Sequence, residues 1–135
     1  TRFEYSALDV PARVDVGAAI PVSVAVRNAG ARDGDEVVQV YVTQLAAGTR
    51  VPIRSLQGVQ RIHLKRGEQQ TVRFALEARQ LATVSDSGQV RLEPGRVLIA
   101  VGGKQPDFKG VADAPTTQVV TAETERTGQA ITLVP

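Results

Sequence analysis

The chain has 135 residues, 42% apolar side chains and a formal net charge of +2, a length that suits one domain with one core. Its apolar stretches are all shorter than the roughly 20 residues that a membrane-spanning helix needs. The absence of cysteine excludes disulfides, thiolate metal sites and a cysteine nucleophile, and the charges are too evenly spread to favour nucleic-acid binding.

The first residues give no export signal, because Glu4 and Asp9 interrupt a stretch that lacks the basic start and apolar run of a signal peptide. Methionine is absent from the whole sequence, so we expect the chain to be a piece of a longer protein. Cysteine-free domains occur in every compartment, and the sequence therefore leaves localisation open.

Apolar side chains alternate with polar ones in short runs separated by Gly, Pro, Asn and Asp, a pattern typical of β-strands. In chain order, we expect strands at Phe3 to Leu8, Ile20 to Val26, Val38 to Val42, Ile62 to Leu64, Val72 to Leu76 and Val97 to Val101. The turn Lys65-Arg66-Gly67-Glu68 predicts a β-hairpin between the fourth and fifth of these strands. Glu77 to Ala82 is expected to form a single helical turn where the chain crosses between two sheets.

This pattern predicts an all-β fold, an immunoglobulin-like antiparallel β-sandwich of about seven strands, as one domain over residues 1–135. Such a domain takes about 100 residues, so we assign the core to residues 3–103. The surplus lies in a long inter-strand segment, Gln44 to Gly58, which shows no clean alternation, and in a C-terminal extension, residues 104–135. The extension is expected to add edge strands at residues 117–121 and 129–134.

The sequence predicts no catalytic, cofactor-binding or metal-binding residue. The acidic side chains fall mostly in turns or in the extension, where a pair of carboxylates would not be held rigidly across a substrate bond. The cluster of Asp33, Asp35 and Glu36 lacks the ligand spacing of a calcium loop, and we predict a solvated turn there. His63, the one histidine, should point to solvent from a strand, on the face opposite Ile62 and Leu64.

Aromatic side chains are few, and tryptophan is absent. Of the five rings, Phe74 falls on a core face, while Tyr41 and Phe108 are candidates for surface rings. A flat stacking platform for sugars is therefore poorly supported, and core or interface roles are favoured for these rings.

Several motifs, taken in order, resemble the fibronectin type III-like domain at the C-terminus of glycoside hydrolase family 3 enzymes. The matching segments are Phe3-Glu4-Tyr5-Ser6-Ala7-Leu8, Val22 to Val42 with Asn28, Gly30 and Gly34 to Val42, Pro52 to Glu68, Glu93-Pro94-Gly95 and Val101-Gly102-Gly103. The sequence departs from the family pattern at Val59, where Phe is common, at Arg66, where Pro is common, and at Val97, where an aromatic residue is frequent.

The resemblance implies that the parent is a β-glucosidase or β-xylosidase whose catalytic residues lie in preceding domains, and that it is periplasmic or secreted. It implies no cofactor and no catalytic residue in this chain, whose expected partners are the catalytic domains of the same parent. Val51, Ile53 and Leu56 are candidates either to dock on those domains or to cap an open end of the sandwich.

Three functions remain open from the sequence. The first is a non-catalytic accessory domain that packs on and stabilises the catalytic domains. The second is a binding module for polysaccharide or the cell surface, suggested by the basic pI and by Tyr41 and Phe108. The third is an adhesion-type sandwich without an attached enzyme.

Overall fold

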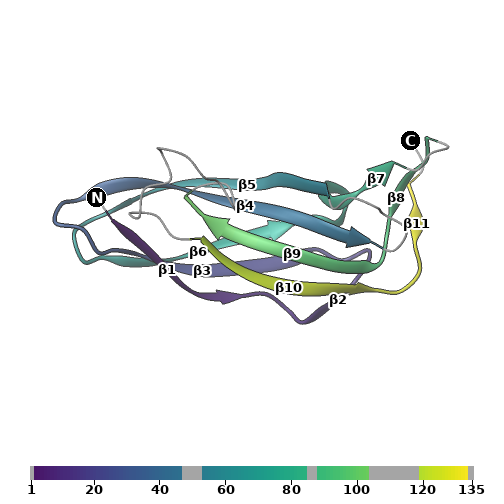
Figure 1. The fold of residues 1–135 in the computed structure, drawn as a ribbon, viewed down its shortest axis with the longest axis horizontal. Helices are drawn as coiled ribbons and strands as arrows, with labels where there is room; N and C mark the ends of the chain where they lie inside the picture. The colour runs from purple at the N-terminus through teal and green to yellow at the C-terminus, as the bar shows by residue number, and fades with distance from the viewer. Residues whose placement is uncertain (1, 47–52, 85–87, 104–118, 134–135) are drawn as a thin grey trace.

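The computed structural model describes residues 2–46, 53–84, 88–103 and 119–133. These residues form eleven strands and one 3₁₀ turn (Figure 1). The elements are β1 Phe3–Asp9, β2 Arg13–Asp15, β3 Ile20–Asn28, β4 Gly34–Ala46, β5 Ile53–Leu64, β6 Gln69–Leu76, η1 Ala78–Leu81, β7 Thr83–Val84, β8 Val90–Leu92, β9 Gly95–Gly102, β10 Val119–Thr127 and β11 Ile131–Thr132. Seven of these strands have seven residues or more, and the predicted all-β class is confirmed.

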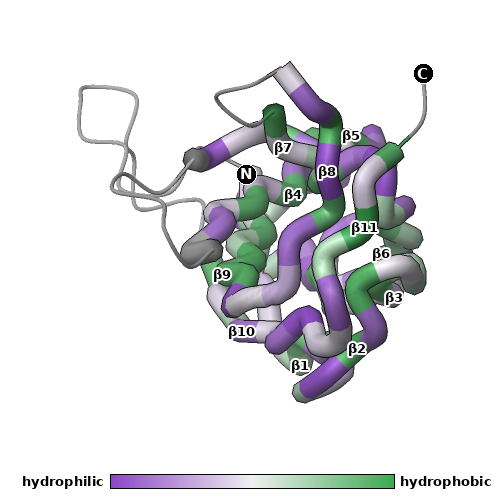
Figure 2. The backbone as a smooth tube through the Cα atoms, turned by 90° about the vertical axis from the view of Figure 1, so that its right-hand side faces the viewer, coloured by the Kyte–Doolittle hydropathy of each residue, from purple (hydrophilic) through white to green (hydrophobic). Residues whose placement is uncertain are grey.

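The strands form two packed layers and a small third sheet. One layer has the order β1-β3-β6, and the other has the order β2-β10-β9-β4-β5. The small sheet, β11-β8-β7, lies across the end of the sandwich opposite the N-terminus (Figures 1 and 2). No helix within the described ranges is long and apolar enough to cross a bilayer.

The core lies between the two layers and follows from the alternation in the sequence. Ile20, Val22, Val24 and Val26 all point inward from β3 and are at most 1% exposed, because alternate side chains of a strand share a face. Val38, Val40 and Val42 of β4 and Val97, Ile99 and Val101 of β9 meet them from the other layer. Each such side chain stabilises the fold by roughly 1.5–3 kcal/mol through burial.

The predicted hairpin between β5 and β6 is wrong. β5 pairs with β4, whereas β6 pairs with β3 in the other layer. The turn at residues 65–68 therefore carries the chain from one sheet to the other. Alternation could not reveal this, because the apolar sides of both strands face one shared core, whichever partner each strand has.

The segment Gln44 to Gly58 is more regular than its sequence indicates. β4 continues to Ala46 and β5 begins at Ile53, while residues 47–52 lie outside the described ranges. A β-bulge between Val40 and Tyr41 of the β4 register adds one residue to β5, since Val40 lies opposite Gly58 but Tyr41 lies opposite Leu56. That extra residue breaks the alternation.

The extension supplies part of the five-stranded sheet. β10 pairs with β9 from Val119 to Arg126, and its last three residues also pair with β2 in parallel. The edge strand predicted at residues 117–121 is present from Val119 and is longer than expected. It is not an edge strand, because β10 lies between β9 and β2. Of the edge strand predicted at residues 129–134, only Ile131 and Thr132 form a strand within the described residues, as β11 at the edge of the small sheet.

The helical turn predicted at Glu77 to Ala82 is confirmed as η1. Its side chains Ala78 and Leu81 are buried, and the Gln80 side-chain oxygen accepts a hydrogen bond from the Glu77 N–H at 2.8 Å. It leads from β6 to β7, and so to the small sheet rather than to the opposite layer of the sandwich.

Candidate functional site

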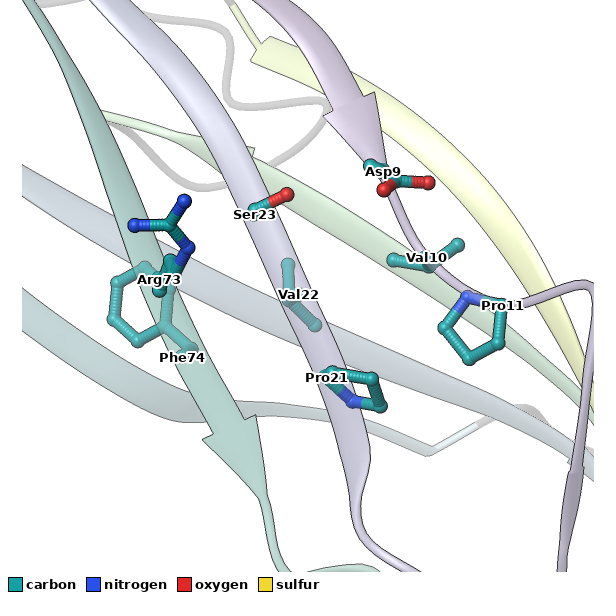
Figure 3. A pocket seen from close by; sticks show the side chains of 8 residues that line it. All are labelled: Asp9, Val10, Pro11, Pro21, Val22, Ser23, Arg73 and Phe74. Atoms are coloured by element: carbon teal, nitrogen blue, oxygen red, sulfur yellow. The ribbon is translucent and has the colours of Figure 1, made fainter.

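A hollow of about 350 Å³ opens on the outer face of the three-stranded sheet, lined by residues 9–11, 21–23 and 73–74 (Figure 3). Asp9 lies opposite Ser23, and Ser23 lies opposite Arg73, so the three form one row across β1, β3 and β6. Figure 3 shows Ser23 between the acidic and the basic side chain. Neighbouring strands are about 4.8 Å apart. Asp9 and Arg73 lie one strand to either side of Ser23, so their backbones are roughly 10 Å apart across the hollow.

A β-bulge in β1 creates this row. The register shifts between Ser6 and Asp9, and Ala7 has a φ of 51°, a left-handed conformation that is unfavourable for a residue with a Cβ. The extra residue turns Leu8 toward the core and Asp9 outward over Ser23. The hollow thus presents an acceptor, a hydroxyl and a guanidinium donor beside Pro11 and Pro21, groups that suit a small polyhydroxylated ligand.

A second polar cluster joins the two layers near the N-terminal end. The buried Tyr5 donates a hydrogen bond from Oη to Oε2 of Glu36 at 3.0 Å. Burial raises the pKa of the Glu36 carboxyl above its ordinary value, although the hydrogen bonds from Tyr5 and from the Val37 N–H oppose that rise. Burial, and then the nearby Glu36 charge, raise the pKa of Tyr5.

His63 is solvent-exposed, as predicted, with 61% of its side chain accessible. It has an acidic partner that the sequence did not reveal, since its Nδ1 lies 2.5 Å from Oδ1 of Asp35. Arg61 donates to the other oxygen of Asp35 at 2.9 Å. The hydrogen bond from His63, and then that from Arg61, lower the pKa of Asp35. We interpret this trio as a surface hydrogen-bond cluster across the ends of β4 and β5.

The acidic cluster is only partly the solvated turn that we predicted. Asp33 is exposed in the turn, where it accepts a hydrogen bond from the Arg66 N–H at 2.8 Å. Asp35 and Glu36 lie in β4 instead, and Glu36 is half-buried. The three carboxylates thus have separate partners, and no group of metal-ligating side chains is found among the described residues.

Two further polar side chains are buried, and the sequence did not predict their burial. Asn28, at 0% exposure, donates from Nδ2 to the carbonyls of Arg32 and Leu64 and accepts from the Gly30 N–H. It fixes the loop after β3 against the end of β5. Its position before a turn was the only available signal.

Arg126 points from β10 into the sandwich and is 2% exposed. Its Nη2 donates to the Val16 carbonyl at 2.8 Å, while Nε and Nη1 have no hydrogen-bond partner in the described structure. Burial lowers the pKa of its guanidinium. The sequence did not predict this burial, because Arg126 is a basic residue in a polar C-terminal segment.

The residues predicted for surfaces have different outcomes. Leu56 is exposed on β5 and lies opposite the half-buried Tyr41. Ile53 begins β5, but its side chain is not described. Val51 and Phe108 lie outside the described residues, so their predicted roles stay predictions.

The layers, the register and the core define an immunoglobulin-like β-sandwich. The family model of the fibronectin type III-like domain matches residues 36–105. The chain belongs to this family. The resemblance seen in the sequence is confirmed, because the related proteins are β-glucosidases and β-xylosidases of glycoside hydrolase family 3.

Two curated relatives illustrate the match. Thermostable β-glucosidase B of Acetivibrio thermocellus is 36% identical over 112 residues, which are 80% of this chain and 15% of that protein. A β-xylosidase of Formosa agariphila is 41% identical over 93 residues, 67% of this chain and 13% of that protein. The chain thus spans only a small part of the length of the relatives it matches.

Solved structures give the same result. The β-glucosidase of Listeria innocua superposes with a TM-score of 0.79 and 26% identity, covering 94% of this chain and 16% of the other. The β-glucosidase of Kluyveromyces marxianus superposes with a TM-score of 0.76 and 27% identity, covering 98% of this chain and 15% of the other.

Proposed function

We propose that this chain is a non-catalytic accessory domain that packs on and stabilises the catalytic domains of a β-glucosidase or β-xylosidase. The observation that carries the proposal is the pair of coverages, 94% of this chain but 16% of the β-glucosidase it superposes on. Nearly the whole sandwich is therefore matched, while most of the relative's chain lies outside the match.

The described chemistry is consistent with a structural role. The polar side chains with close partners link strands and loops: Tyr5 joins two sheets, Asn28 holds a loop, and Asp35 bridges neighbouring strands. β10, which follows residue 103, pairs with β9 and β2, which supports one domain over residues 1–135.

Removing the domain from its full-length chain tests this proposal. The truncated enzyme should give less soluble protein and be cut faster by a protease at a fixed temperature, because the surface that the domain covers becomes exposed. Equal yield and equal protease resistance would contradict a stabilising role.

A second candidate function is a polysaccharide-binding module, and the hollow of Figure 3 is the observation that favours it. Retention of the chain on xylan and cellulose should fall in an Asp9→Asn, Arg73→Gln double variant if the hollow binds sugar. Retention that is already no greater than that of a neutral control protein would exclude this function.

A further inference from the structure

The outer face of β4 and β5 carries an exposed apolar patch. Val37 is 38% exposed, Leu56 46% and Val59 56%. Leu56 lies opposite the half-buried Tyr41, and Val59 opposite Gln39, two residues further along the same face. We call Val37, Tyr41, Leu56 and Val59 the β4–β5 patch.

The β-bulge between Val40 and Tyr41 of the register places Leu56 in this patch. Val40 lies opposite Gly58, so an unbroken ladder would set Val42 opposite Leu56 and turn that leucine into the core. With the extra residue, Leu56 points outward instead. A large apolar side chain is thus held in solvent by the geometry of the strand, although burying it would be favourable by roughly 1.5–3 kcal/mol.

Among the described residues, the opposite face of the sandwich offers no comparable surface. Side chains that point outward from β1, β3 and β6 include Glu4, Ser23, Arg27, Gln69, Thr71 and Arg73. The other large apolar side chains exposed in the described ranges, Val84, Val90 and Ile131, belong to the small sheet at the end. In the part of the chain that the structure describes, the face formed by β4 and β5 is the one broad face that presents such side chains.

Charges around the patch are largely paired with each other. Arg61 pairs with Asp35 at 2.9 Å on one side, and Arg96 approaches Glu123 to 3.8 Å on β9 and β10. Because these charges are paired, the rim of the patch would not attract a polyanion. Tyr41 is the one aromatic residue of the patch. An apolar centre with a polar rim is typical of protein interfaces, so the chemistry indicates another protein surface.

We infer that the β4–β5 patch is the surface by which the domain docks on the catalytic domains of its own full-length chain. This inference rests on the proposed function. The length of the relatives indicates what covers the patch. The matched region is 15% of the relative from Acetivibrio thermocellus, so the other parts of such a chain are available to cover an apolar face. Docking buries Leu56 and Val59 and leaves the outer face of β3 and β6 in solvent.

Charge substitution in the full-length chain tests the surface. A Leu56→Asp, Val59→Asp double variant should melt several degrees below the parent, because two carboxylates would be buried at the interface. Gln69→Asp and Thr71→Asp, exposed on the polar face outside the hollow, form the matched control and should leave the melting temperature within about one degree. Equal shifts for the two pairs would overturn the inference.

Hydroxyl-radical footprinting of the unmodified full-length chain gives a reading that does not depend on folding of a variant. Val59 and Val84 are 56% and 69% exposed in the domain, so without docking they should be oxidised to a similar extent. Docking through the patch predicts that Val59 and Leu56 are oxidised several-fold less than Val84.

The experiments distinguish failure of the docking inference from failure of the proposed accessory function. If removal of the domain lowers the melting temperature but Val59 is oxidised as readily as Val84, another face docks and the accessory role stands. If removal of the domain changes nothing, the accessory role fails, and the docking surface with it. Protection that appears only at high protein concentration would assign the patch to a second copy of the chain.

Discussion

Tyr5 of β1 and Glu36 of β4 are joined by a 3.0 Å hydrogen bond that links the two layers of the sandwich. Tyr5 is buried and Glu36 is half-buried, and burial raises the pKa of each. The link therefore joins a phenol and a carboxyl group whose charged forms are both poorly solvated.

Because of Glu36, the free energy of unfolding of the chain should depend on pH in the acid range. Because its folded-state pKa is raised above the unfolded value, the folded state holds the proton more tightly, and stability is lost as pH rises through this range. Glu36→Gln, which keeps an acceptor for Tyr5, should therefore gain stability relative to the parent as pH rises from 3.5 to 7 (about the range of carboxyl titration). Thermal unfolding of both proteins across this range measures the difference, and a difference that stays constant would contradict the assignment.

Asn28→Ala should be one of the more damaging single substitutions. It removes three hydrogen bonds of 2.8 to 3.0 Å and leaves the carbonyl of Leu64 and the N–H of Gly30 without this partner. A loss of about 3 kcal/mol in the free energy of unfolding is expected, measured by urea denaturation. Arg27→Ala, an exposed neighbour with only a 3.4 Å contact to Glu4, is the control and should lose less than about 1 kcal/mol.

Gly58 is required where β5 passes close to β6. A Cβ at this position would lie 2.8 Å from Cδ1 of Phe74, so Gly58→Ala should destabilise the chain by about 1–3 kcal/mol through overpacking. Phe74→Leu removes the obstructing ring atoms. In a double-mutant cycle the two losses should be less than additive, and strict additivity would show that the contact is not the cause.

Arg126→Met should raise the melting temperature. The substitution loses the bond to the Val16 carbonyl but removes a buried charge whose Nε and Nη1 lack partners in the described structure. Replacing a poorly compensated buried charge by an apolar side chain of similar volume is often neutral or stabilising by about 1–4 kcal/mol. A lower melting temperature for Arg126→Met than for the parent would show that the guanidinium itself stabilises the fold.

Alternation predicted β3, β4 and β9 because their inner positions are occupied by valine and isoleucine. It underestimated β10, whose inward positions include Thr124 and Arg126. Because the inner face of β10 is partly polar, the sequence shows no clear apolar alternation there. The full extent of the strand is known from its pairing with β9 and β2 in the structure.

The contacts that matter most for the candidate surfaces could not be predicted from sequence. The link between Tyr5 and Glu36 depends on how two sheets are stacked. The outward position of Leu56 depends on one extra residue in β5. Neither has a local sequence signature, whereas the exposure of His63 follows from its place in an alternating strand.

The most direct test of the accessory role compares the full-length chain with the same chain lacking this domain. Thermal unfolding should show a transition several degrees lower without the domain, while turnover measured well below both transitions stays within about twofold, since no step of catalysis is assigned to the domain. An unchanged transition, or turnover lost while the transition is retained, would contradict the proposal.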